Sequence, residues 1–99
     1  HITGGGLIDN LPRVIPNNLS AIINTNTWAT PKIFNWLSDQ CKIDSYEMFR
    51  TFNCGVGLVL CVEKNNVEDA INRLHDSGET AWLIGEVAEN NKQPKVQLK

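Results

Sequence analysis

The spacing of apolar positions along the chain alternates between runs typical of strands and a repeat typical of helices. Apolar runs predict strands over residues 19–23, 56–62 and 81–87, and a short closing strand over residues 95–98. The run 56–62 is apolar at nearly every position, as in strands that are covered on both faces. We therefore expect this strand to be buried, with one face covered by structure outside this chain.

Helical spacing predicts two short helices in the first half of the chain. The first follows a run of glycines and gives way to extended chain near Pro12, because proline lacks a backbone donor. Thr30 and Pro31 predict the start of the second, since a hydroxyl residue caps a helix and proline fits its first position. We expect that helix to end near Gln40.

Two further helices are predicted in the second half. Asp44 or Ser45 caps a shorter helix that runs through Phe49. Asn66 and Gly78 mark the start and the stop of a longer amphipathic helix. Its apolar face is formed by Val67, Ala70, Ile71 and Leu74. This is the clearest helical pattern in the chain.

The order of these elements favours an α+β fold. The helices are few and grouped, and the polar residues 89–92 predict a short turn that joins the last two strands. A mixed or antiparallel sheet packed with helices fits this order better than a doubly wound sheet does. The length of 99 residues, without a linker-like segment, predicts one domain.

Charge and cysteine content narrow the class of protein. The net charge of −2 and the scattered basic residues provide no surface for nucleic acid, and no apolar run is long enough for a membrane span. The three cysteines form no metal-binding pair with a nearby histidine, and their odd number is typical of a reducing cytoplasm. Cys61 lies in an apolar run, so we expect it to be buried.

Three consecutive glycines ahead of the first helix form a candidate anion site. Glycine lets backbone N–H groups turn toward an anion, and a helix start adds roughly half a positive charge. The sequence therefore predicts a phosphate site at Gly4, Gly5 and Gly6. A flexible terminal tail is the alternative interpretation of the same residues.

A second polar, glycine-containing segment covers residues 50–57, and we expect it to converge with residues 1–13. Arg13 or Arg50 would then offer a phosphate its fork of N–H donors. Two plainer roles stay open, because Arg50 has the i, i+3 spacing for an ion pair with Glu47 and Asn53 can cap a turn.

The remaining polar residues do not assemble into a known catalytic group. No Ser-His-Asp, Cys-His or paired-carboxylate arrangement can be assigned, and the glycine run lacks the Lys-Ser/Thr of a P-loop. His1 adjoins the glycines and could donate to a phosphate or move a proton, whereas His75 is placed to complement a helix dipole. Hydrolase and P-loop kinase activities are therefore disfavoured.

Three stretches together resemble the C-terminal part of the aminoimidazole ribonucleotide synthetase family, also called phosphoribosylformylglycinamidine cyclo-ligases. They are residues 1–14, which hold the glycine run and an Asn-Leu-Pro-Arg-Val sequence, residues 48–57, and residues 81–85. The resemblance extends in the family's order from residue 1 to about residue 87.

The resemblance implies a cytoplasmic step of de novo purine synthesis. ATP would activate the formamide oxygen of formylglycinamidine ribonucleotide, a nitrogen of the substrate would close the imidazole ring, and ADP and phosphate would leave. Because the nucleophile belongs to the substrate, the protein would supply orientation, charge neutralisation and placement of Mg²⁺.

The resemblance also implies that two domains have separate roles. A separate N-terminal domain, absent from residues 1–99, would carry most ATP and Mg²⁺ contacts and form a homodimer. The chain would then be a partial C-terminal domain, without a metal site and inactive by itself. The site residues that it implies are His1 as the catalytic candidate, Thr3, Gly4, Gly5, Gly6, Asn10 and Arg13 as the substrate and phosphate loop, and Arg50, Thr51, Asn53 and Gly55 as its supporting wall.

A different class of function stays open. The same residues would also suit a stand-alone module that binds a phosphorylated metabolite or a partner protein.

Overall fold

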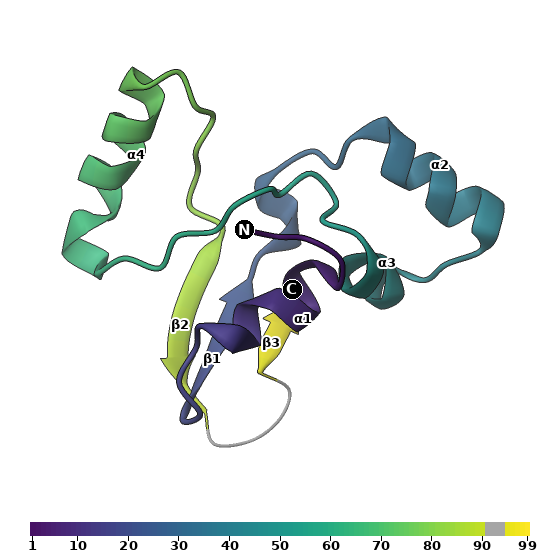
Figure 1. The fold of residues 1–99 in the computed structure, drawn as a ribbon, viewed down its shortest axis with the longest axis horizontal. Coiled ribbons are helices and arrows are strands. Elements are labelled where there is room, and N and C mark those ends of the chain that lie inside the picture. Colours follow the sequence, from purple (N-terminus) through teal and green to yellow (C-terminus); the bar gives the residue numbers. More distant parts are fainter. Residues whose placement is uncertain (91–94) are drawn as a thin grey trace.

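The structure, a computed structural model, describes residues 1–90 and 95–99. Its helices are α1 (Gly6–Asn10), α2 (Lys32–Cys41), α3 (Ser45–Thr51) and α4 (Val67–Asp76), its 3₁₀ turns are η1 (Leu11–Arg13), η2 (Thr25–Thr27) and η3 (Lys64–Asn66), and its strands are β1 (Leu19–Ile23), β2 (Gly85–Glu89) and β3 (Val96–Leu98) (Figure 1). The α+β class expected from the sequence is confirmed.

The sheet is three-stranded and mixed, in the order β2-β1-β3. Strand β1 is antiparallel to β2, from the pair Leu19 and Glu89 to the pair Ile23 and Gly85. It is parallel to β3, where Ala21 lies opposite Val96. A simple hairpin would require the last two strands, β2 and β3, to be neighbours. They are not neighbours, because β1 lies between them. Residues 91 and 92 of the turn predicted over residues 89–92 lie outside the described residues.

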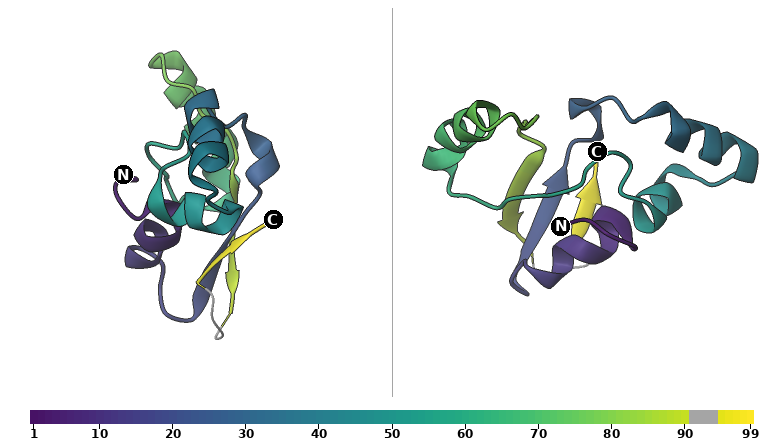
Figure 2. Two further views of the ribbon diagram at one scale, coloured as in Figure 1. Left: turned by 90° about the vertical axis from the view of Figure 1, so that its right-hand side faces the viewer. Right: turned by 45° about the horizontal axis from the view of Figure 1, so that its top comes forward.

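One face of the sheet carries the core. Helices α1 and α3 lie on this side of the sheet (Figure 2). Alternate positions of β1, Ala21 and Ile23, are buried and pack with Leu7 and Leu11 from the first two helical turns. This is the period-2 alternation expected of a strand with one covered face. The core therefore ties the N-terminal segment directly to the central strand.

The close packing of α1 on the end of α3 depends on Gly6. A Cβ atom at this position would overlap the backbone carbonyl oxygens of Phe49 and Phe52. Gly6 also has a φ of +57°, which side chains other than glycine rarely adopt. The third glycine of the run is thus required by packing, independently of any ligand.

The helix boundaries follow the sequence closely, with two local differences. Asp44 caps α3 as predicted, since its Oδ1 accepts the Glu47 N–H at 2.9 Å. Helix α2 starts at Lys32 with Pro31 in the cap position, so the expected cap at Thr30 is wrong by one residue. Helix α4 begins after Asn66 as predicted, although the side chain of Asn66 makes no capping hydrogen bond.

The apolar run 56–62 is extended but is not a strand, and that prediction is wrong. The described residues place no strand beside it, and a strand exists only where a neighbour completes its hydrogen bonds. Cys61, expected to be buried, is exposed for the same reason. The strand predicted over residues 81–87 instead begins at Gly85, because β1 ends opposite that residue.

Within residues 1–90 and 95–99, no helix has the length and apolar character needed to cross a bilayer.

The role of Gly6 gives a first prediction. Gly6→Ala should lower the free energy of unfolding by about 2 kcal/mol or more, because it adds both a steric overlap and an unfavourable φ. Urea denaturation measures the change. Gly57→Ala is the matched control, since a Cβ there has nothing within 4 Å. Equal stability of the two variants would contradict the proposed packing role.

Candidate functional site

A hollow of about 330 Å³ lies between the N-terminal loop and the end of α3. It is lined by Ile2, Thr3, Gly4, Phe34, Thr51, Phe52 and Asn53. The two polar segments that we expected to converge therefore meet here, although about fifty positions separate them in the sequence. The backbone bond from Ile2 N–H to the Gly57 carbonyl, 2.8 Å long, joins the same two segments.

The N-terminal loop is braced from within by Asn10. The Nδ2 atom of this buried side chain lies 3.2, 3.3 and 2.8 Å from the carbonyl oxygens of Thr3, Gly4 and Gly6. Its Oδ1 lies 3.5 Å from the Thr3 hydroxyl. Asn10 thus shapes the loop from behind, and its expected contact with a substrate stays a prediction.

Only part of the glycine run is open to a ligand. Gly6 is buried, and its N–H donates to the Thr3 carbonyl at 3.0 Å. Gly5 packs against Asp9, so that a Cβ on Gly5 would lie 3.0 Å from the Asp9 carboxylate oxygen Oδ2. A carboxylate this close repels an anion. Gly4 is exposed and lines the hollow, so the available backbone donor of the run is there.

The opposite wall is a tight turn that follows α3. The Oδ1 of Asn53 accepts the Gly55 N–H at 2.9 Å, which confirms the turn-capping role left open above. The indole N–H of Trp28 donates to the Cys54 carbonyl at 3.0 Å. Gly55, with a φ of +100°, packs on Pro31, where a Cβ would lie 2.6 Å from the proline Cδ. These contacts fix the turn in one conformation.

Cys54 lies inside this turn and faces away from solvent. Burial raises the pKa of its thiol, because the charged thiolate is disfavoured away from water. The side chain therefore stays a neutral thiol near pH 7, and its Sγ contacts the Met48 carbonyl at 3.5 Å. It acts as a packed apolar group rather than as a nucleophile.

The charged residues assigned to the site lie outside the lining of the hollow. Arg50 extends from the exposed side of α3, and its guanidinium lies 3.9 Å from the Glu47 carboxylate, as the alternative interpretation predicted. Arg13 and His1 are both exposed, and neither lines the hollow. Recognition inside the hollow itself thus depends on neutral donors and acceptors.

The residues present do not fit ATP-bound Mg²⁺. The lining of the hollow contains no carboxylate. In the described parts of the chain, no group of three or more His, Cys, Asp or Glu residues could hold a metal ion. Oxygen ligands, chiefly carboxylates, are what Mg²⁺ requires.

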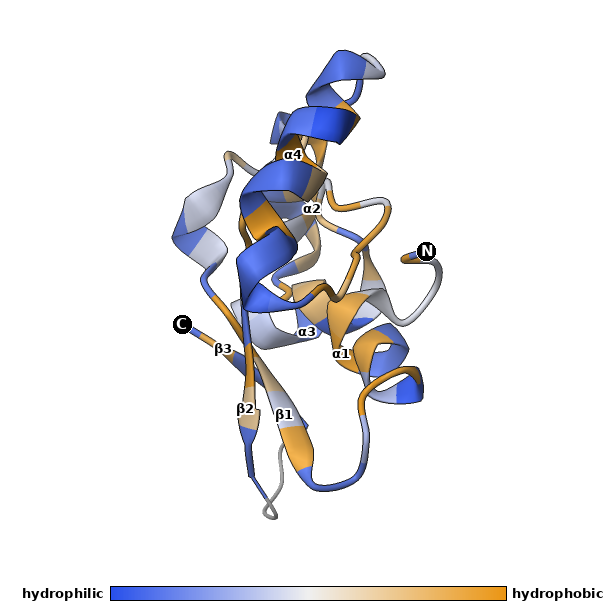
Figure 3. Ribbon diagram, turned by 90° about the vertical axis from the view of Figure 1, so that its left-hand side faces the viewer, coloured by the Kyte–Doolittle hydropathy of each residue, from blue (hydrophilic) through white to orange (hydrophobic). Residues whose placement is uncertain are grey.

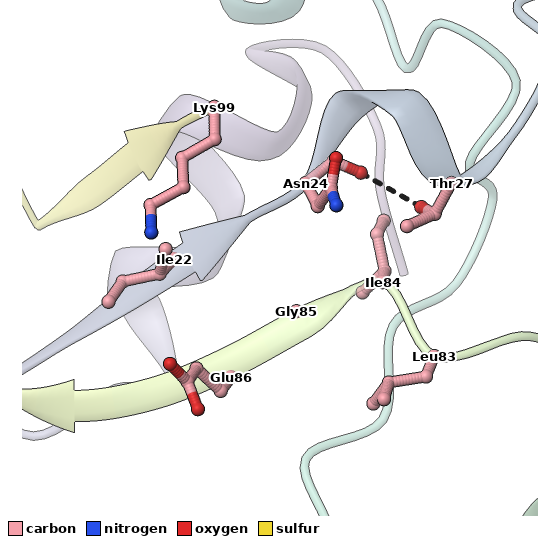
Figure 4. Close-up of a pocket in the computed structure, with 8 residues that line it drawn as sticks. All are labelled: Ile22, Asn24, Thr27, Leu83, Ile84, Gly85, Glu86 and Lys99. Carbon is pink, nitrogen blue, oxygen red and sulfur yellow. Dashed lines mark hydrogen bonds between the residues drawn. The ribbon is translucent and has the colours of Figure 1, made fainter.

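A second hollow, of about 280 Å³, lies where β1 ends and β2 begins (Figure 4). The Thr27 hydroxyl donates to the Asn24 carbonyl across one side of it, at 2.8 Å. Glu86 and Lys99 also line it. None of the site residues expected from the sequence contributes to this hollow.

Comparison with known proteins identifies the family. The family model described as "AIR synthase related protein, C-terminal domain" matches residues 1–97. The chain belongs to this family. Phosphoribosylformylglycinamidine cyclo-ligases from two Coxiella burnetii strains, RSA 331 / Henzerling II and RSA 493 / Nine Mile phase I, are each 50% identical to it over 99 residues. That alignment covers 99% of the chain and 28% of each relative, so the chain spans less than a third of their length.

The hollow of this family member includes residues that the sequence did not indicate. Phe34 reaches it from α2, and its ring centroid lies 5.9 Å from that of Phe52. Trp28 holds the turn at Cys54 from a segment with no distinctive motif. The sequence singles out neither residue for a site, because a helical or aromatic pattern gives no sign of which cavity a ring will line.

The hydrogen bonds from Asn10 to the N-terminal loop give a second prediction. Asn10→Asp replaces an N–H donor by a carboxylate that faces three carbonyl oxygens, so it should lower the free energy of unfolding by about 2–3 kcal/mol. Burial beside carbonyl oxygens raises the pKa of this carboxyl, so the loss should shrink as the pH is lowered from 7 toward about 4, because the protonated acid can donate again. Urea denaturation across this pH range tests both statements.

Asn35→Asp, on the exposed side of α2, is the control for the added charge. If the two substitutions lowered the free energy of unfolding equally at pH 7, the hydrogen bonds of Asn10 would not stabilise the loop.

Proposed function

We propose that this chain forms the substrate-side wall of a phosphoribosylformylglycinamidine cyclo-ligase, a cytoplasmic enzyme of purine biosynthesis. The enzyme would close the imidazole ring of formylglycinamidine ribonucleotide with ATP. The observation that supports this most strongly is the 50% identity to the Coxiella enzymes along 99% of the chain. The hollow between the N-terminal loop and the turn after α3 supplies a place for the substrate.

The hollow offers neutral hydrogen-bond donors to a phosphate or a carbonyl oxygen. Its lining includes Thr3, Gly4 and Thr51, which carry hydroxyl and backbone N–H groups. The Oδ1 of Asn53 is already bonded to Gly55, which leaves the Nδ2 of Asn53 as its donor toward a ligand. Together these groups would bind an anionic oxygen through several hydrogen bonds to fixed positions.

Cationic help would come from Arg50, which directly precedes the lining residue Thr51. Its ion pair with Glu47 is half exposed and 3.9 Å long. Such a pair contributes little free energy, so the guanidinium is free to turn to a phosphate when one binds. We assign Arg13 and His1, both exposed, to contacts with parts of the substrate that extend out of the hollow.

The proposal gives this chain orientation rather than bond-making. Asn10, Gly5 and Gly6 shape the loop, and Gly55 shapes the turn, so the donors are in place before the substrate arrives. ATP and Mg²⁺ would be held by an N-terminal domain that lies outside this chain and that forms the homodimer. Within residues 1–90 and 95–99, no group of side chains matches a Mg²⁺ site.

A third prediction tests the hollow by ligand binding. Formylglycinamidine ribonucleotide, titrated into the isotope-labelled chain, should shift the amide resonances of Gly4, Thr51 and Asn53. Gly4→Ala adds a methyl group to the lining without a clash, so it should weaken binding at least about fivefold and leave stability unchanged. The control Gly57→Ala has equally open surroundings and should bind as the wild type does. Shifts confined to other residues would refute the assignment.

A fourth prediction concerns activity. The 99-residue chain mixed with formylglycinamidine ribonucleotide, ATP and Mg²⁺ should form no ADP above background, because it lacks the proposed metal and nucleotide site. A coupled assay for ADP measures this. ADP formation that depends on the substrate would show that the chain is catalytically complete.

A further inference from the structure

The turn after α3, which forms one wall of the hollow beside the N-terminal loop, holds a side chain in an unfavourable backbone conformation. Cys54 has a φ of +51°, in the left-handed region that residues other than glycine rarely adopt, and Gly55 after it has a φ of +100°. Such a residue costs free energy and persists only where the surrounding structure holds it in place. The position of Asn53 in the lining therefore depends on contacts that stabilise this turn.

Trp28 supplies a contact of this kind from a distant part of the chain. Its indole N–H donates to the Cys54 carbonyl oxygen at 3.0 Å, and 26 positions separate the two residues. The bonds from the Gly55 N–H to the Asn53 Oδ1 and from the Val56 N–H to the Asn53 carbonyl, by contrast, lie within the turn itself. Trp28 packs against the core and does not line the hollow, so it ties the turn to the core from outside the site.

Trp82 in turn holds the indole of Trp28. The centroids of the two rings lie 6.0 Å apart with an interplanar angle of 39°, within the range of favourable aromatic pairs. The indole N–H of Trp82 donates at 3.2 Å to the hydroxyl of Thr27, the residue directly before Trp28. Trp82 thereby contacts the ring of Trp28 and also the neighbouring residue of its backbone.

Trp82 belongs to a part of the chain that is far from the hollow in sequence. It lies in the segment between α4 and β2, which are both labelled in Figure 3. Helix α4 is hydrophilic at most positions in that figure, and it lies away from α1 and α3 in Figure 1. None of its residues is fully buried, whereas Trp82 packs against the core. Through Trp82, the segment after α4 therefore reaches the residue that holds the turn at Cys54.

We propose that Trp28 and Trp82 are positioning residues of this hollow. Trp82 holds the indole of Trp28, and the N–H of that indole holds the Cys54 carbonyl. The turn then keeps Asn53 oriented toward a ligand, although neither tryptophan lines the hollow. The identity of the ligand rests on the proposed function, whereas the effect of the two indoles on the turn does not.

Hydrogen exchange of the ligand-free, isotope-labelled chain tests the proposal as a fifth prediction. Trp28→Phe keeps an aromatic ring but removes the N–H donor, so the turn should open more often. The Val56 amide, which donates to the Asn53 carbonyl at 3.0 Å, should then exchange at least about fivefold faster relative to the Ala21 amide. The Ala21 amide of β1 is also hydrogen-bonded, and its exchange reports opening of the sheet.

Two further variants complete this measurement. Trp82→Phe keeps the ring contact with Trp28 but loses the bond to the Thr27 hydroxyl, so it should raise the same ratio of exchange rates at least about twofold. Trp36→Phe is the matched control, because Trp36 on α2 is 57% exposed and does not line the hollow, and it should leave the ratio unchanged. Circular dichroism checks that each variant is folded. An unchanged ratio in either Trp28→Phe or Trp82→Phe would overturn the proposal.

Ligand binding by the same variants separates this proposal from the proposed function. Formylglycinamidine ribonucleotide should bind at least about fivefold more weakly to Trp28→Phe and at least about twofold more weakly to Trp82→Phe. Because Trp82 acts through Trp28, the double variant should bind no more weakly than Trp28→Phe alone. Losses that multiply in the double variant would contradict this order of action. A wild type that does not bind the ribonucleotide would refute the proposed function, and the exchange rates would still decide the positioning role.

Discussion

The approach of α1 to the last turn of α3 is the contact on which the site depends. The two helices come so close because Gly6 has no side chain to meet the carbonyl oxygens of Phe49 and Phe52. The same approach seats Leu7, which is completely buried, between the sheet and α3. The loop before α1 is thereby fixed beside the turn after α3, and the hollow between them is a consequence of this packing.

Local hydrogen bonds then give the two walls their shape. Asn10 satisfies three carbonyl oxygens of the loop, and the Trp28 indole satisfies the carbonyl of Cys54 in the turn. Buried polar groups without a partner would cost free energy, so these bonds hold the backbone in one arrangement. The groups that remain available in the hollow are therefore uncharged donors at fixed positions, with the arginines outside it.

The region from residue 57 to residue 84 shows a different balance of forces. Its apolar groups are correctly spaced for a strand and a helix, but the described chain buries none of them fully, and Val59, Trp82 and Ile84 are the ones that pack against the core. A chain of 99 residues has a limited core, and this arm lies beyond it.

The sequence by itself determined the features that depend on near neighbours. The cap at Asp44, the stop at Gly78 and the amphipathic pattern of α4 follow from local chemistry, and so does the turn at Asn53. The resemblance to the cyclo-ligases also came from sequence alone.

Tertiary structure decided whatever depends on contacts distant in the chain. It made the apolar run 56–62 an open extended segment, because a strand needs a neighbour that no local pattern supplies. It placed β1 between the last two strands, and it set the Asp9 carboxylate beside Gly5, so that the exposed glycine of the run that lines the hollow is Gly4. The sequence marks which groups can form hydrogen bonds, but only packing determines which of them are used within the protein and which stay free for a ligand.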